Sequence, residues 1–283
     1  MPPLTLPADR QAATRSPSIA AMTVALITGA SSGLGEATAR RLASEPDMRL
    51  VLLARRGDRL EQLAAALPAP ATALALDLID EDAPARARAH LEQHHGGRLD
   101  LLVNNAGAGG RGAFSDTGHA VVRATMALNF DAQVRLVEEL LPLLRSSAPS
   151  AIVNVASTAG RIGRPGAGAY SASKAAFAVW SDSLRAEEHL HGVHVGTVMP
   201  GFIPTEGFPH RELARKRRTR WLLGTPQQAA EAIVETGLGR RAERYVPRFY
   251  GGVAALRTVA PGLVRRALAS KRADVLATKT HDP

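Results

Sequence analysis

The chain has 283 residues, 45% of them hydrophobic, so it can bury the core of one α/β domain, and we expect a single domain. It contains no cysteine, which excludes disulfide frameworks and thiolate metal sites and favours a reducing, cytoplasmic location. The net charge of +9 is concentrated near the C-terminus, because residues 211–283 hold 16 Lys+Arg against 6 Asp+Glu whereas residues 1–210 hold 19 against 20.

The first 21 residues carry four prolines and no hydrophobic periodicity, which predicts a disordered leader, with Met22 as an alternative start. A signal peptide is the competing interpretation, because Arg10 and Arg15 precede the apolar run IAAMTVALITGA. Cleavage after that run would remove the first predicted strand and the glycine loop that follows it, so we disfavour a signal peptide. No other segment approaches about 18 continuous apolar residues, and we expect no membrane span.

Short runs rich in Val, Leu and Ile alternate with helical patterns along the chain. The runs predicted as strands buried on both faces are 24–29, 49–55, 71–78, 99–105, 151–157 and 194–200, and a late strand near 243–247 is expected to close the sheet. Between them, segments such as 35–45, 57–67 and 134–145 space their apolar residues as amphipathic helices do. This alternation predicts a Rossmann-type, doubly wound parallel sheet in a three-layer α/β/α sandwich.

The segment TGASSGLGEA (28–37) joins the first strand to the first helix and carries Gly29, Gly33 and Gly35. Glycines let the backbone approach a pyrophosphate closely, and a helix amino end supplies N–H donors, so we predict a dinucleotide site. The same residues fit the G-x-S-x-G elbow of a hydrolase around Ser31. We disfavour that reading, because such an elbow follows several strands and needs an oxyanion donor from one of their loops.

A second glycine-rich stretch, GAGGRG (107–112), matches G-x-G-x-x-G literally. The helix and the ribose-binding acid that surround a true fingerprint are not evident in the sequence around it. We interpret it as a flexible loop over the site.

In a dinucleotide site of this kind, the residue near the end of the second strand determines whether NAD or NADP is preferred. There the sequence reads LLARRGD, with Ala54 and Arg55 where an acid would favour NAD. Because an arginine can grip a phosphate through charge-assisted hydrogen bonds, we predict NADP (NADPH), with NAD less favoured. The preference rests mainly on Arg55, with help from Arg56.

Further motifs follow in order: NNAG (104–107), Asn129 in a helical segment, Ser157 at a strand end, Tyr170-x-x-x-Lys174 thirteen residues later, and PGFIPT (200–205). With the glycine loop, they make the sequence resemble the short-chain dehydrogenase/reductase family over roughly residues 23–205. The resemblance implies an oxidoreductase with the catalytic set Asn129, Ser157, Tyr170 and Lys174. The coenzyme-binding residues that it implies are Gly29, Ser31, Ser32, Gly33, Leu34, Gly35, Arg55, Asp77, Leu78, Asn105, Ala106, Gly107, Tyr170, Lys174, Pro200, Gly201, Ile203 and Thr205.

Within this set, a spacing of four places Tyr170 and Lys174 on one face of a helix. A free tyrosine has a pKa near 10 and exchanges protons poorly at neutral pH. An ammonium about 4 Å away, at an effective dielectric near 20, favours the phenolate by about 4 kcal/mol, or roughly three pKa units. We therefore expect Tyr170 to act as general acid/base and Lys174 to lower its pKa. The resemblance adds that Lys174 holds the nicotinamide ribose, that Ser157 binds the substrate oxygen and that Asn129 positions a relay water.

A substrate lid is expected at 202–224, within the catalytic domain predicted for 22–248, and a basic amphipathic extension is expected at 249–283. Within 211–220 lie six Lys/Arg followed by Trp221, which fits either a solvated helix face or a contact with an anionic lipid surface or acidic carrier. Nucleic-acid binding is disfavoured, since no recognised module surrounds the basic run. The histidines of HLHGVH (189–194) are expected to mark a helix end, and we predict no metal site.

Substrate specificity in such a fold resides in the loops, so the fold and the coenzyme chemistry do not identify the substrate. We expect a lipophilic ketone or aldehyde first and a 3-oxoacyl thioester second. A cofactor-binding regulator without catalysis is the alternative from another class. The resemblance also implies a homodimer or homotetramer through helices near 121–145 and 171–190.

Overall fold

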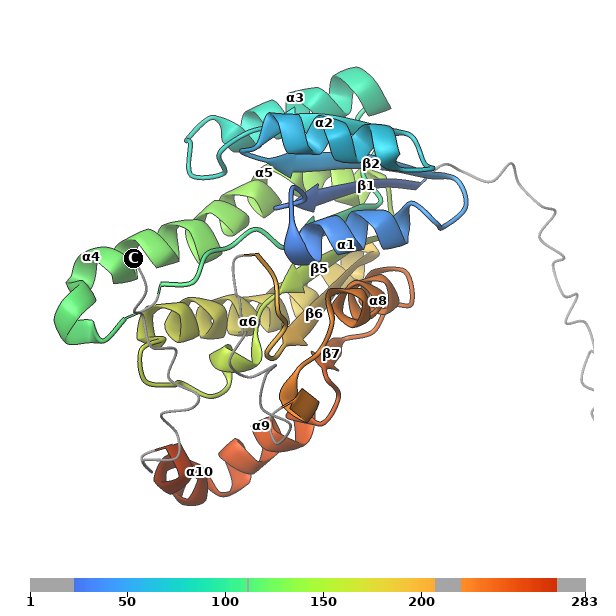
Figure 1. The fold of residues 1–283 in the computed structure, drawn as a ribbon. Coiled ribbons are helices and arrows are strands. Elements are labelled where there is room, and N and C mark those ends of the chain that lie inside the picture. The colour runs from blue at the N-terminus through green and yellow to red at the C-terminus, as the bar shows by residue number, and fades with distance from the viewer. Residues whose placement is uncertain (1–22, 111, 207–219, 269–283) are drawn as a thin grey trace, which may run out of the picture.

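Seven parallel strands form one sheet in the computed structural model, which describes residues 23–110, 112–206 and 220–268 (Figure 1). Their spatial order is β3-β2-β1-β4-β5-β6-β7. The strands are β1 (Thr23–Thr28), β2 (Met48–Ala54), β3 (Ala71–Ala75), β4 (Leu101–Asn104), β5 (Ser150–Val155), β6 (Val193–Pro200) and β7 (Glu243–Val246). The chain reverses its direction of travel across the sheet between β1 and β4, and ligands of such sheets bind beyond the carboxyl ends of the strands at that point.

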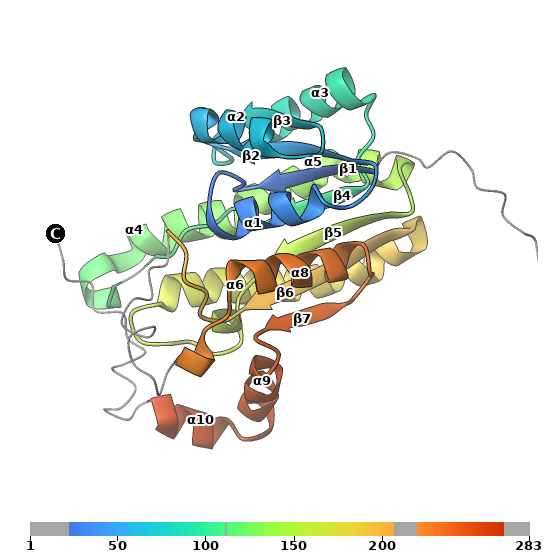
Figure 2. The ribbon, with the colours of Figure 1, turned by 45° about the vertical axis from the view of Figure 1, so that its right-hand side comes forward.

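Alternate side chains of each central strand enter two separate cores. On β1, Ala25 and Ile27 pack on one face, and Val24 and Leu26 pack on the other. The first face is covered by α1 (Gly33–Leu42), α2 (Gly57–Ala66) and α8 (Pro226–Gly237), and the second by α3 (Ala83–His95), α5 (Ala132–Ser146) and α6 (Gly168–Glu188). Figure 2 shows α1 and α8 in front of the sheet and α6 behind it. The predicted three-layer sandwich is confirmed.

One prediction about the strands is wrong. The run that contains β3 was expected to be buried on both faces, but residues 71–74 are only half-buried and Ala75 is exposed. The reason is position, because β3 pairs with β2 alone and ends the sheet. The predicted late strand is confirmed, since β7 pairs parallel with β6 at the opposite edge.

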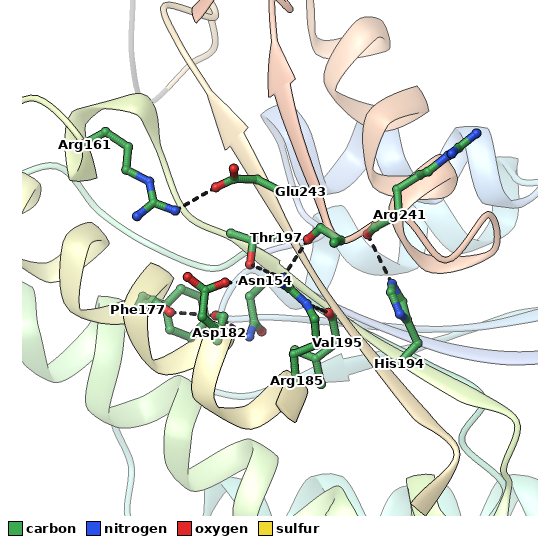
Figure 3. A network of polar contacts seen from close by, with 12 residues as sticks. Asn154, Arg161, Phe177, Asp182, Arg185, His194, Val195, Thr197, Arg241 and Glu243 are labelled. Atoms are coloured by element: carbon green, nitrogen blue, oxygen red, sulfur yellow. Dashed lines mark hydrogen bonds and ion pairs between the residues drawn. The ribbon is translucent and has the colours of Figure 1, made fainter. Parts of the chain in front are cut away.

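Helix α6 is tied to the sheet by a polar network that Figure 3 shows. The guanidinium of Arg185 donates to the carbonyl oxygens of Val195 (2.5 Å) and Ala242 (2.7 Å), which belong to β6 and to the segment before β7. Below the helix, the Asn154 amide of β5 donates to the Ser181 hydroxyl at 2.8 Å. These bonds hold α6 against β5, β6 and the segment before β7. The first turns of α6 face the end of β5.

Helix α4 (Phe114–Met126) runs into α5 through a π-helical turn, Ala127–Asp131. Beyond β7, α9 (Tyr250–Val259) and α10 (Pro261–Leu268) extend from the sheet edge (Figure 2). The predicted leader, residues 207–219 of the predicted lid and residues 269–283 of the extension lie outside the described residues. Among the helices that are described, none is both long and apolar enough to cross a bilayer.

Candidate functional site

A cavity of about 300 Å³ opens beyond the carboxyl ends of the central strands. The segments that line it follow β1, β2, β3, β4, β5 and β6, together with the first turns of α6. Every predicted coenzyme-binding residue except Gly35 lines it, and of the predicted catalytic set Ser157, Tyr170 and Lys174 do so. The parallel arrangement brings these side chains together because each follows a strand that ends at the same edge of the sheet.

The glycine loop between β1 and α1 is tightly packed. Gly33 has a φ of 59°, a left-handed backbone conformation that residues other than glycine rarely adopt. A Cβ at Gly35 would overlap the carbonyl oxygen of Gly29 and the Asn105 side chain. Gly35 therefore shapes the loop from behind, which explains why it does not line the cavity.

Thr28 organises the other side of this loop, and sequence reasoning missed it. Its hydroxyl accepts the backbone N–H groups of Asn105 and Ala106, each at 2.9 Å, and donates to the carbonyl oxygen of Val103 at 3.3 Å. The Asn105 amide donates in return to the Thr28 carbonyl oxygen at 2.9 Å. The signal available was a hydroxyl residue at the last position of β1, directly after four apolar residues.

Ser157 lies two residues beyond the end of β5, in an extended conformation, and is 6% exposed. Its hydroxyl donates to the carbonyl oxygen of Pro200 at 3.2 Å and accepts the backbone N–H of Ala159 at 3.1 Å. These two bonds aim the hydroxyl between the ends of β5 and β6. A hydroxyl held there can hydrogen-bond an oxygen in the cavity.

Tyr170 and Lys174 lie in the first two turns of α6, where both line the cavity. Lys174 is 4% exposed, and its amine donates to the Val155 carbonyl oxygen at 2.7 Å. Burial lowers the pKa of Lys174 from its ordinary value to about 8, because desolvation disfavours the charged form. The amine is therefore still mostly protonated at neutral pH.

Asn129 is fully buried in the π-helical turn and does not line the cavity. Its amide nitrogen donates to the Ala108 carbonyl oxygen (2.9 Å) and the Ser173 hydroxyl (3.0 Å), and its oxygen accepts the Ala108 N–H (2.8 Å). Both amide N–H groups are thus used within the protein. The side chain fixes the loop that follows β4 against α6, so that Gly107 faces the cavity.

Two arginines follow β2, and they differ in exposure and in the residues that they contact. Arg55 is 73% exposed and lies 3.7 Å from the Asp77 carboxylate. Arg56 lies across the glycine loop, where it donates to the hydroxyls of Ser31 (3.0 Å) and Ser32 (2.6 Å). Sequence reasoning ranked Arg55 first, but Arg56 is the cation in contact with the loop.

Glu206 lies beside these arginines but does not line the cavity. It pairs with Arg59 at 2.7 Å and with Arg56 at 3.2 Å. The hydrogen bond and the charge of Arg59, with smaller contributions from Arg56, hold the Glu206 pKa below its usual range. The glutamate follows directly on Thr205, so these pairs connect the end of PGFIPT to the start of α2.

The opposite end of the cavity holds two residues that the sequence did not single out. Arg164 lies in the segment between Ser157 and Tyr170, and its guanidinium carbon is 4.6 Å from the centre of the Phe202 ring. Phe202 lies against Tyr250, with 6.5 Å between ring centres. The available signal for Arg164 was a cation in a loop bounded by two predicted catalytic residues.

Comparison with known proteins gives one consistent family. The family model for short chain dehydrogenases matches residues 23–215. Dehydrogenase/reductase SDR family member 7B of Bos taurus is 34% identical over 88% of this chain and 81% of its own length. A ketoacyl reductase, HetN, of a Nostoc species is 32% identical over 74% of this chain and 73% of its own.

Solved structures agree with these sequence relatives. A short-chain dehydrogenase from Streptomyces avermitilis superposes with a TM-score of 0.71 at 31% identity, covering 87% of this chain and 97% of its own. A short chain dehydrogenase from Burkholderia cenocepacia, solved in complex with NADP, has a TM-score of 0.75 at 24% identity and covers 88% and 98%. At that identity the second likeness concerns the fold alone.

Proposed function

The chain belongs to the short-chain dehydrogenase/reductase family, and from that premise we propose that it interconverts a carbonyl and an alcohol with NADP(H), using Tyr170 as general acid/base. As a member of this family it is an oxidoreductase of CH–OH groups that uses NAD(P). The observation that carries the proposal is that Ser157, Tyr170 and Lys174 share one cavity with the glycine loop.

The residues around the cavity suit a dinucleotide. The glycine loop packs so closely at Gly29 and Gly35 that a Cβ at either position would crowd its neighbours. The amino end of α1 lies beside this loop. We propose that this loop holds the pyrophosphate, that Asp77 and Leu78 border the adenine, and that Ile203 and Thr205 hold the carboxamide. When bound, the nicotinamide supplies or accepts the hydride.

The protein side chains then manage the proton and the developing charge. In reduction, the Tyr170 hydroxyl donates its proton to the substrate oxygen as the alkoxide forms, and in oxidation its phenolate accepts that proton. The Ser157 hydroxyl turns its proton from the Pro200 carbonyl oxygen to the substrate oxygen and donates a hydrogen bond to it. The Lys174 ammonium favours the phenolate form of Tyr170. Asn129 acts as a positioning residue through the loop at Ala108.

A lipophilic ketone or aldehyde is the proposed substrate, because Leu128, Ala156, Phe202 and Ile203 line the cavity beside the polar set. Reduction of a 3-oxoacyl thioester is the second candidate. It is favoured by the named ketoacyl reductase among the relatives. A regulator that binds the coenzyme without turnover is the third, and the polar set in the cavity argues against it.

The proposal is tested by following coenzyme absorbance while purified protein meets a panel of medium-chain ketones, aldehydes and 3-oxoacyl thioesters with NADPH. We expect steady oxidation of NADPH with at least one class, and the class identifies the substrate. Protein that binds NADPH with micromolar affinity yet oxidises it with no member of the panel would support the regulator instead.

The coenzyme preference gives a separate prediction. If Arg55 and Arg56 bind the 2′-phosphate, Arg55→Ala and Arg56→Ala should each raise the Kd for NADPH by roughly 10- to 100-fold and that for NADH by less than about threefold. Arg59→Ala is the matched control, because Arg59 is close by and pairs with Glu206 but does not line the cavity. Equal losses for both coenzymes would refute the proposed phosphate contact.

We also propose a peripheral contact between α9–α10 and anionic membranes, with the protein otherwise cytoplasmic. Val259 is 83% exposed and Leu263 61%, and Arg265 and Arg266 are exposed on the same helix as Leu263. Apolar and cationic side chains in this combination favour an anionic lipid surface. Sedimentation should show more protein on vesicles with phosphatidylserine than on pure phosphatidylcholine, and Leu263→Asp should remove the difference. Equal pelleting with both vesicles would contradict the proposal.

We propose a homodimer or homotetramer that assembles through α5 and α6, because members of the family commonly form such oligomers. Val179 on α6 is 60% exposed, as an interface position would be in the isolated chain. Light scattering after gel filtration distinguishes these states from a monomer.

A further inference from the structure

The guanidinium of Arg56 is shared among three acceptors at the edge of the coenzyme cavity. Its Nε and Nη2 donate to the Ser31 hydroxyl at 3.1 and 3.0 Å, and Nη2 also donates to the Ser32 hydroxyl at 2.6 Å. Its Nη1 donates to the Glu206 carboxylate at 3.2 Å. All three nitrogens of the guanidinium are therefore engaged, and one of them is engaged by a negative charge.

Glu206 reaches this guanidinium from a distant part of the sequence. It follows the PGFIPT segment after β6, 150 residues from Arg56, which follows β2. Its other carboxylate oxygen accepts a hydrogen bond from Arg59 at 2.7 Å. Arg56 lines the cavity, whereas Glu206 does not. The carboxylate therefore acts on a bound coenzyme through Arg56, from the side of the guanidinium that faces away from the cavity.

NADPH and NADH differ in the group that Arg56 is proposed to bind. A phosphate monoester carries a charge of about −1.5 to −2 at neutral pH, whereas the 2′-hydroxyl of NADH is neutral. A 2′-phosphate bound to Arg56 must share the guanidinium with the Glu206 carboxylate or displace it, and two anions on one guanidinium repel each other. A neutral hydroxyl meets no such repulsion. The carboxylate therefore disfavours one coenzyme and leaves the other unaffected.

We propose that Glu206 sets the selectivity between NADPH and NADH by competing with the 2′-phosphate for Arg56. The hydroxyls of Ser31 and Ser32 hold the guanidinium at the glycine loop, so its orientation does not depend on the carboxylate. The preference for NADPH is then smaller than the arginines alone would give. This inference rests on the proposed function, in particular on the phosphate contact of Arg56, and it makes Glu206 a positioning residue.

The size of the effect follows from the exposure of the pair. The side chains of Arg56 and Glu206 are 42% and 54% exposed, so solvent screens their interaction and the change in affinity is several-fold. Screening also makes the effect depend on salt, because the Debye length falls from about 20 Å at low ionic strength to a few Å near 1 M. A contact that only shaped the loop would show no such dependence.

Glu36 supplies a matched control. It lies in the first turn of α1, beside the same glycine loop, but its carboxylate pairs with Arg40 at 2.9 Å and does not line the cavity. Removal of its charge by Glu36→Gln affects NADPH and NADH alike, so the ratio of their dissociation constants stays constant. Glu206→Asp is the second control, because it shortens the side chain and keeps the charge.

The test measures coenzyme binding and needs no turnover. The Kd values for NADPH and NADH are determined by fluorescence titration for wild type, Glu206→Gln, Glu206→Asp and Glu36→Gln. In about 20 mM salt we expect Glu206→Gln to raise the ratio Kd(NADH)/Kd(NADPH) by roughly three- to tenfold, through tighter binding of NADPH. In about 500 mM salt the increase should fall below about twofold. Glu206→Asp and Glu36→Gln should keep the wild-type ratio within about twofold.

A double-mutant cycle shows whether Glu206 acts through Arg56. In an Arg56→Ala background, the same Glu206→Gln substitution should change the ratio by less than about twofold. The inference is overturned if Glu206→Gln raises the ratio by less than threefold at low salt, lowers it, or acts equally in the Arg56→Ala background. It is also overturned if Glu36→Gln raises the ratio as much as Glu206→Gln does.

Failure of this inference and failure of the proposed function give different results. If Arg56→Ala weakens NADPH but Glu206→Gln leaves the ratio unchanged, the phosphate contact stands and the inference alone is wrong. If Arg56→Ala leaves the Kd for NADPH unchanged, the phosphate contact is wrong and the inference is overturned with it. Protein that shows the expected ratios yet reduces no carbonyl would retain the inference and remove the oxidoreductase.

Discussion

Tyr170→Phe is expected to lower kcat for carbonyl reduction by roughly 10²- to 10⁴-fold, the range that proton transfer by a positioned side chain contributes. The substitution removes one hydroxyl from a side chain that lines the cavity and leaves the helix, the ring and the glycine loop in place. NADPH affinity should therefore change by less than about threefold. The measurement is steady-state kinetics at saturating NADPH, with coenzyme binding followed by fluorescence.

Tyr245→Phe is the control for this variant. Tyr245 is half-buried in the edge strand β7, does not line the cavity, and has its hydroxyl near two charged groups, Arg161 and Glu243. We expect its kcat to match the wild type. A Tyr170→Phe protein with more than about a tenth of wild-type kcat would show that the proton comes from another group, and the proposed mechanism would then be wrong.

Lys174→Met is expected to shift the pH dependence of alcohol oxidation. An ammonium close to a phenol lowers the phenol pKa by about 1–3 units, so its removal should move the alkaline rise of kcat/KM upward by that amount. Each unit reduces the phenolate fraction at neutral pH about tenfold. At pH 7 the oxidation rate should therefore fall by roughly 10- to 1000-fold.

The sign of this effect depends on the charge of Lys174 itself. Burial lowers the pKa of its amine to about 8, so the ammonium is present below that pH and is lost as the pH rises through 8. The influence on Tyr170 is then fully available at pH 6–7 and fades above 8. Profiles of kcat/KM from pH 6 to 10.5 for wild type and Lys174→Met should diverge most at the acidic end. Superimposable profiles would exclude an electrostatic role for Lys174 and leave only a binding role.

The described part of α6 explains how such a lysine can exist in the core. The Lys174 amine has the Val155 carbonyl as a partner at 2.7 Å, and its ammonium is 5.6 Å from the centre of the Phe177 ring. Both contacts favour the charged form, whereas burial opposes it. A methionine would keep the volume and remove the charge, which makes the comparison of pH profiles interpretable.

Local sequence patterns predicted most of the fold because their physical cause is local. Runs of Val, Leu and Ile that form buried parallel strands, and apolar residues at helical spacing, are visible without any knowledge of neighbours. The glycine loop could be recognised for the same reason, since the need for a left-handed φ at Gly33 is a property of a few consecutive residues. The error at β3 arose because burial of a strand depends on its place in the sheet, which its own residues do not state.

The sequence by itself determined the strand and helix order, the dinucleotide loop and the group of residues that now line one cavity. Tertiary structure alone decided that Arg56 rather than Arg55 touches the glycine loop, that Asn129 uses both its amide N–H groups on Ala108 and Ser173, and that Thr28 secures the loop after β4. It also decided that Arg164 stands over the Phe202 ring. These are contacts between segments 21 to 77 residues apart, and the direction of a side chain across such distances follows from how strands and helices pack, which no short pattern records.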